Sequence, residues 1–290
     1  MSSLAFALVL FSGLMHALYN VLIKRSRNKT VFIWWMFASS TLLFTVILPF
    51  LPGQFPRPDF TVIFLGAGGG FCFVLYHLFT GRAYQSGDLS ATYPLTQTAM
   101  LYIPLWGVWL LGEQLSPAGF GGIAIVAAGA YLLQMRRITL PELLRPFGTL
   151  VDQTMLSALA AGFVYSLGAI IDKTGVNRYS PLYFTYILVV AMLAFMTVNL
   201  LRPRYRELIA VEWRENRRLI LAGGPLMMGS FLSFRFGLAL SPMSYAVTVR
   251  QVSVLAGVLI GVFFLGESCG RIRFCAALLI LAGVCLIRFG

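Results

Sequence analysis

The chain has 290 residues, of which 59% are hydrophobic and only 11% are charged. Soluble domains carry about 25% charged residues, so this chain has too few polar side chains to cover a water-facing surface. The net charge of +12 does not indicate nucleic-acid binding, because Lys and Arg fall in short segments between apolar runs, as they do when positive charge sets membrane topology.

Ten apolar runs follow one another along the chain, each long enough to cross the hydrocarbon core as a helix. The first is predicted to be a retained span and not a signal peptide, because it lacks a basic start and its apolar face continues to Lys24. The runs are continuous and do not alternate, which favours helices over a β-barrel. The predicted helices are 4–23, 31–50, 60–83, 90–111, 117–135, 154–172, 181–201, 219–239, 243–265 and 272–289.

The two halves of the chain repeat each other. A shift of 154 residues places Gln97 on Gln251 and the Leu-Gly-Glu sequence ending at Glu113 on the one ending at Glu267. Five helices per copy is an odd number, so the second copy must enter the membrane in the opposite sense, as in many secondary transporters. The predicted fold class is an all-α integral membrane protein with ten transmembrane helices in two inverted five-helix repeats, residues 1–139 and 140–290.

The paired Leu-Gly-Glu endings, with the polar turn and Gly-rich helix that follow Glu113, resemble EamA-type members of the drug/metabolite transporter superfamily. The resemblance covers essentially the whole chain. It implies a central cavity lined by the first, third, fourth, sixth, eighth and ninth helices, with the fifth and tenth at the periphery. The segment from His16 to Lys24 also resembles a less studied EamA subgroup, some members of which are associated with phosphonate utilisation.

Polar side chains recur along the helices that this resemblance places around the cavity. Ser12, His16, Asn20 and Lys24 stand every four residues, so they share one face of the first helix, and a polar face is costly against lipid. Serines such as Ser12, Ser90 and Ser244 are expected to hydrogen-bond helix to helix instead. The predicted substrate-binding residues are His16, Tyr19, Asn20, His77, Tyr84, Tyr93, Gln97, Tyr165, Arg250 and Gln251.

Charged residues narrow the class of substrate. Arg250 lies about 7 residues into the ninth predicted helix, or about 10 Å at the helical rise. Burial of arginine at that depth is usually tolerated for function, although the long side chain could also reach toward the interface. Arg235 is expected to reach the interface. Every acid is expected in a loop or at a helix end. Asp172 is expected at the cavity edge, where it could pair with Lys173 or bind the positive group of a zwitterionic substrate.

Glu113 and Glu267 each precede a helix and are expected to accept from its free backbone N–H groups. A basic cavity with no acid at mid-membrane favours an anionic group on the substrate and argues against a cationic drug.

The predicted function is secondary active or facilitative transport, by alternating access, of a small polar metabolite with an anionic group: a phosphonate, phosphate ester, carboxylate or amino acid. His16 and His77 are possible sites of proton coupling. A flippase for an anionic or polyprenyl-linked lipid is the alternative. An intramembrane enzyme would need clustered acids and histidines, and a scaffold role would leave the repeat without a purpose.

No catalytic residue, metal site or cofactor is predicted, because the four cysteines lack paired metal spacing. The expected partners are a small-molecule substrate and membrane lipids, not nucleic acid, and the chain is expected to be a monomer or weak dimer. The predicted location is the cytoplasmic membrane. Most Lys and Arg lie after odd-numbered helices, so the positive-inside rule places both termini outside the cytoplasm, whereas related transporters commonly keep theirs inside.

Overall fold

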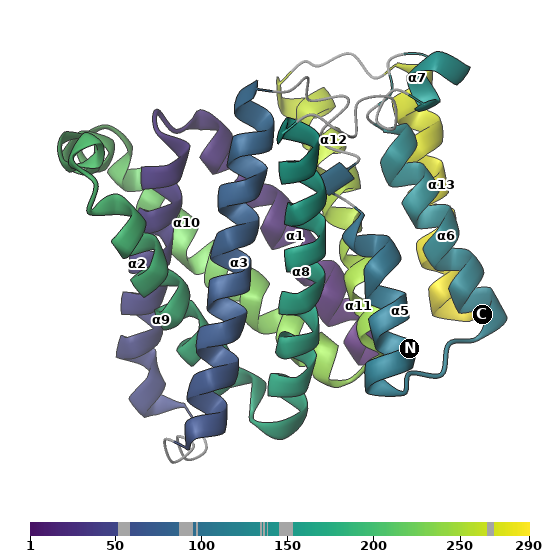
Figure 1. The fold of residues 1–290 in the computed structure, drawn as a ribbon, viewed down its shortest axis with the longest axis horizontal. Coiled ribbons are helices and arrows are strands. Elements are labelled where there is room, and N and C mark those ends of the chain that lie inside the picture. The colour runs from purple at the N-terminus through teal and green to yellow at the C-terminus, as the bar shows by residue number, and fades with distance from the viewer. Residues whose placement is uncertain are drawn as a thin grey trace.

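The computed structural model describes residues 1–51, 59–86, 95–96, 98–133, 135, 137, 139–144, 153–265 and 270–290. The regular elements of these residues are all helical, and most run along the long direction of one bundle (Figure 1). In chain order they are α1 (Ser3–Arg25), α2 (Lys29–Ile47), the 3-10 turn η1 (Leu48–Phe50), α3 (Phe60–Ser86), α5 (Ala99–Leu111), α6 (Pro117–Leu132), α7 (Leu140–Leu144), α8 (Gln153–Arg178), α9 (Pro181–Leu200), the 3-10 turn η2 (Pro203–Tyr205), α10 (Arg206–Ala239), α11 (Met243–Arg250), α12 (Val252–Leu265) and α13 (Arg271–Phe289).

Seven helical stretches in the described part of the chain are long and apolar enough to cross a bilayer: α1, α2 with η1, α3, α8, α9, α10 and α13. The shorter helices α5 and α6 are also apolar. Each of these lies within or overlaps a span that the sequence predicts, so the chain is a multi-pass membrane protein. The predicted helix 90–111 is only partly covered, because residues 87–94 and 97 lie outside the described residues.

Three predicted spans differ from the helices of the structure. The sixth does not end at residue 172, because α8 continues to Arg178. The helix that contains the eighth begins earlier, at Arg206, because residues too charged for hydrocarbon still favour a helix outside it, and its backbone leaves the helical region at Asn216, three residues before the predicted start. The ninth is divided at Gln251 into α11 and α12. A carbon added at Gly13 would lie 3.4 Å from the Arg250 carbonyl oxygen, so α1 packs directly against this break.

The packing of the helices has the two-fold relation of an inverted repeat. The first helix of each repeat packs on the third helix of the other: α1 on α10, and α8 on α3. The last helices, α6 and α13, cross at small residues, with Gly122 against Gly283 and Gly129 against Ala276. A shift of 154 residues converts the Gly122–Gly283 contact into the Gly129–Ala276 contact. Residue numbers therefore increase along α6 as they decrease along α13, so the two helices are antiparallel. The two copies therefore run in opposite senses, which confirms the predicted fold class.

A carboxylate from one repeat begins a helix of the other. The Glu113 side chain accepts hydrogen bonds from the backbone N–H of Met243, from that of Ser244 at 3.2 Å and from the Ser244 hydroxyl at 2.6 Å. Glu113 was expected to serve the helix that follows it, but Ser116 caps that helix by accepting from Gly119 N–H at 3.0 Å. The carboxylate therefore stabilises the start of α11 across the repeat interface. The equivalent Glu267 lies outside the described residues.

Candidate substrate-binding cavity

A cavity of about 550 Å³ lies between helices of both repeats. Its walls come from α1, α3, α8, α10, the α11–α12 break and the residues Thr96, Ala99 and Met100, as the family resemblance implies. It is also lined by α2 and α9, which were not expected, through residues such as Phe37 and Met192. Among the described residues, none that lines it belongs to α6 or α13, so these two helices are peripheral to the cavity.

Arg250 is the last residue of α11 and extends its guanidinium into the cavity. The guanidinium carbon lies 4.3 Å from the centre of the Phe234 ring, which supports it from one side. Its Nη2 lies 3.5 Å from His16 Nδ1 and 3.5 Å from the Ser230 hydroxyl. The buried Nε has no hydrogen-bond partner among the described residues. A guanidinium with an unoccupied donor in a cavity is suited to bind an anion.

His16 and Tyr19 form a polar pair on the cavity face of α1. The Tyr19 hydroxyl lies 2.5 Å from His16 Nδ1, and the rings meet edge to face with centroids 4.8 Å apart. Both the Tyr19 hydroxyl and Arg250 can donate to Nδ1, so this nitrogen acts as the acceptor. Asn20 also lines the cavity and is exposed. Of the polar face predicted for the first helix, His16 and Asn20 therefore face the cavity.

Aromatic rings of α3 and α8 form another part of the cavity wall. The Tyr165 ring contacts those of Tyr76 and Phe73, with centroid distances of 5.1 Å and 5.8 Å. His77 follows Tyr76 at a ring distance of 5.2 Å and also lines the cavity. These rings give an apolar wall with phenol and imidazole groups, which suits a substrate that has both a charged and an uncharged part.

Asp172 and Arg235 form a buried ion pair that the sequence does not predict. Arg235 Nε donates to Asp172 Oδ1 at 2.7 Å, and the two residues are 3% and 1% exposed. The prediction that Arg235 reaches the interface is wrong, as is the prediction that every acid lies in a loop or at a helix end. Because α8 continues to Arg178, Asp172 lies six residues before the end of the helix, about 9 Å at the helical rise. The only sequence feature that could have indicated this pair is the presence of one acid and one arginine, of opposite charge, within two apolar helices.

Lys173 does not pair with Asp172. Its ammonium donates to the carbonyl oxygens of Leu238 at 2.7 Å and Ser241 at 2.9 Å, where α10 ends. The backbone carbonyls at a helix end lack intrahelical partners and carry the negative end of the helix dipole, so an ammonium satisfies both needs. Asp172 and Lys173 thus make two separate links between α8 and α10.

The structure brings most of the predicted site residues together. Those that line the cavity are His16, Tyr19, Asn20, His77, Tyr165, Arg250 and Gln251. Tyr84 lies in α3, but its side chain is outside the described part of the chain, as are Tyr93 and Gln97 entirely. Two serines bond helix to helix as expected: Ser12 donates to the Ser230 carbonyl at 2.8 Å, and Ser244 bonds Glu113.

Inverted repeats around a polar cavity are the architecture of a membrane transporter. The sequence profile of the EamA-like transporter family matches residues 3–135 and 153–289, so the chain belongs to that family. No curated protein matches the sequence. One protein of known crystal structure is similar over 100% of this chain and 99% of its own, with a TM-score of 0.75. At 18% identity, that likeness shows the fold alone. The family comprises membrane transporters of small molecules.

Proposed function

We propose that the chain transports a small polar metabolite bearing an anionic group, such as a phosphonate, phosphate ester, carboxylate or amino acid. The observation that carries the proposal is the contrast between two cavity arginines. Arg235 is neutralised by Asp172 at 2.7 Å, whereas Arg250 is held by a ring and two hydroxyl or imidazole contacts of 3.5 Å and keeps its Nε free of partners in the described residues. Arg250 therefore has charge and donors available for an anion.

In an alternating-access cycle, the Asp172–Arg235 ion pair can act as a contact that closes one end of the cavity. The cavity reaches the exposed Lys29 at the end of the bundle where α1 meets α2. Asp172, Arg235 and Lys173 tie α8 to α10 toward the other end, where α10 leads into α11. We infer that these links close that end while substrate enters beside Lys29, and that they must separate when the protein opens the other way. His16, next to Arg250, is the proposed site for proton coupling.

Counterflow in proteoliposomes tests the proposal with a panel of phosphonates, sugar phosphates, carboxylates and amino acids. We expect at least one anionic or zwitterionic compound to exchange, and we expect Arg250→Ala to reduce its exchange by about tenfold or more, the effect of losing one charge-assisted hydrogen bond. Arg250→Lys, which keeps the charge but not the planar donors, should retain an intermediate rate.

The matched control is Arg271→Ala, which removes an exposed arginine at the start of α13 and should leave exchange unchanged. Size-exclusion profiles and thermal midpoints of each variant separate loss of transport from loss of folding. Exchange restricted to quaternary ammonium dyes would contradict the proposed charge of the substrate. Movement of a labelled lipid without exchange of any soluble compound would favour the flippase.

A further inference from the structure

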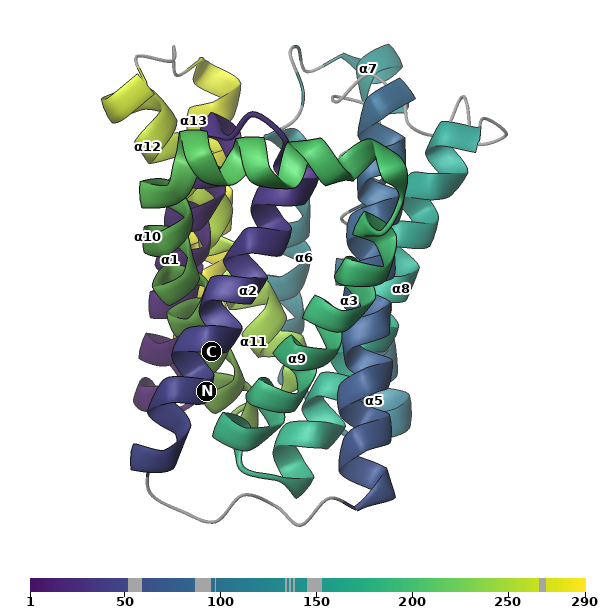
Figure 2. The ribbon, with the colours of Figure 1, turned by 90° about the vertical axis from the view of Figure 1, so that its left-hand side faces the viewer.

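The first third of α10 lies outside the membrane core. The helix has 34 residues, about 51 Å at the helical rise, whereas the hydrocarbon core is about 30 Å thick. Its backbone leaves the helical region at Asn216 (φ −121°, ψ 16°). Before this bend, residues 206–216 cross the end of the bundle almost at right angles to the other helices (Figure 2). Figure 1 shows the same part of the helix at the edge of the bundle, beside α2. We call it the rim segment.

The inner face of the rim segment is fixed to α2. The Trp213 ring packs on the Trp35 ring with centroids 4.7 Å apart. The indole N–H of Trp35 donates to the Ile209 carbonyl at 3.1 Å. Because indole rings favour the boundary between hydrocarbon and headgroups, this contact indicates the depth at which the segment lies.

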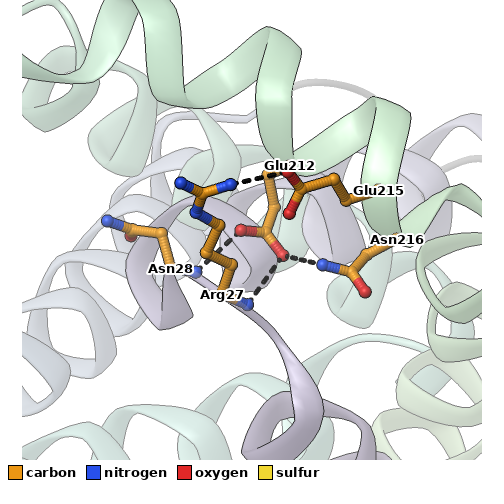
Figure 3. Close-up of polar contacts among 5 residues, drawn as sticks. All are labelled: Arg27, Asn28, Glu212, Glu215 and Asn216. Carbon is orange, nitrogen blue, oxygen red and sulfur yellow. Dashed lines mark hydrogen bonds and ion pairs between the residues drawn. The ribbon is translucent and has the colours of Figure 1, made fainter.

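Two acids near the end of the rim segment are occupied by the loop between α1 and α2 (Figure 3). Glu212 is 1% exposed and accepts from Asn28 N–H at 2.7 Å, from Arg27 N–H at 3.3 Å and from the Asn216 amide at 2.7 Å. Glu215 pairs with the Arg27 guanidinium at 2.6 Å. These carboxylates are therefore turned toward the loop and do not neutralise the arginines around the bend.

The arginines at the bend are exposed and stand at the depth of lipid phosphates. Arg217 and Arg218 follow Arg214 by three and four residues, and all three are exposed. Leu221, four residues after Arg217, is 57% exposed on a helix that crosses the membrane, so it contacts lipid tails. Arg217 thus lies about 6 Å above a tail-facing residue. The polar headgroup layer is about 5–8 Å thick on each side of the core.

We propose that Arg214, Arg217 and Arg218 bind the headgroup phosphate of a phospholipid with net negative charge. Guanidinium groups bind phosphate through two parallel hydrogen bonds, and arginines near a membrane surface each favour anionic lipid by about fivefold in affinity. Because Glu212 and Glu215 are bonded to the α1–α2 loop, the bound phosphate supplies the negative charge that the three arginines need. The lipid holds the bend of α10 at the membrane surface, beside the entrance lined by Lys29. This proposal does not depend on which substrate the cavity binds.

Native mass spectrometry of the purified full chain tests the proposal, with phosphatidylglycerol and phosphatidylcholine as the added lipids. The wild-type protein should retain phosphatidylglycerol in preference to phosphatidylcholine, and added salt should reduce that preference. The double variant Arg217→Gln with Arg218→Gln should weaken retention of phosphatidylglycerol by about fivefold or more. Retention of phosphatidylcholine should be unchanged. The variant Arg217→Lys with Arg218→Lys keeps the charge and should keep most of the preference.

The control is Arg271→Gln with Arg273→Gln, which removes the same charge at the start of α13, across the bundle from the rim segment. It should lose less of the preference for phosphatidylglycerol than the test variant does. Equal retention of the two lipids by the wild type would overturn the proposal, as would equal losses in the control and the test variant. If the glutamine variant does not fold, the lysine variant and the salt titration of the wild type still decide: a preference insensitive to salt rules out recognition through these arginines.

Discussion

The two residues of the buried Asp172–Arg235 ion pair are expected to be strongly coupled in their effect on stability. Arg235→Gln leaves the Asp172 carboxylate buried without its partner, a change that costs about 3–5 kcal/mol in other proteins. The double variant Asp172→Asn with Arg235→Gln removes both charges and should recover most of this loss. Thermal unfolding of the purified variants in detergent measures both effects. If the losses of the two single variants simply add in the double variant, the two groups do not act as a pair.

The contrast between Arg235 and Arg250 shows what sequence reveals about a membrane site. Both arginines lie in apolar helices and line the cavity, but the sequence predicted only Arg250 as a binding residue, because it lies deeper in its predicted helix. It gave no partner for Arg235, because Asp172 belongs to a different helix of the same repeat, 63 residues away. Periodicity along one helix identifies which residues share a face. It does not identify the residue on a second helix that faces them.

The start of α3 provides an acid-sensitive contact outside the membrane. Asp59 accepts from Val62 N–H at 2.9 Å and from the Tyr179 hydroxyl at 2.8 Å, and these hydrogen bonds lower the pKa of Asp59 below its ordinary 3.8. A lowered pKa in the folded state stabilises the fold above pH 3.8, and that contribution is lost as the pH falls through the lowered value.

Wild-type protein should therefore exceed Asp59→Asn in thermal midpoint near neutral pH, and the difference should shrink as the pH falls below 3.8. Tyr179→Phe removes one of the donors to Asp59 and should show a smaller difference over the same range, with the same sign. Unfolding scans at a series of pH values measure the effect. A constant gap between wild type and Asp59→Asn would show that the cap contributes through geometry and not through its charge.

The bounds of helices were predicted best where the whole helix lies in the hydrocarbon core. Apolar runs such as those of α2, α9 and α13 correspond closely to predicted spans, because the hydrocarbon core requires about 20 such residues. The errors fall where a helix leaves that core or breaks within it. The rim segment is charged, so its helix is invisible to a hydropathy window. The division at Gln251, against which Gly13 packs, falls inside an apolar run, and no hydropathy window detects it.

At the scale of the whole molecule, the two ends of the bundle differ in charge, and this difference predicts orientation. The end with the α1–α2 loop and the rim segment carries exposed cations such as Arg25, Lys29 and Arg214. Lys173 follows an even-numbered predicted helix and so counts toward the other end by sequence, but its ammonium is buried on the carbonyls that end α10 and contributes little charge there. The charge difference is thus larger than the sequence alone implied. The positive-inside rule then places the α1–α2 loop in the cytoplasm and both termini outside it.

Cysteine labelling in intact cells tests this orientation in a background where Cys72, Cys269, Cys275 and Cys285 are replaced by serine. A membrane-impermeant maleimide should label Ser2→Cys from outside, because Ser2 precedes α1 at the end with little charge. Arg25→Cys, at the other end of the same helix, should be labelled only after the membrane is permeabilised. The reverse pattern would show that other parts of the chain outweigh these loop charges during insertion. It would also place the cavity entrance beside Lys29 on the outer face, and so reverse the direction from which the described conformation admits substrate.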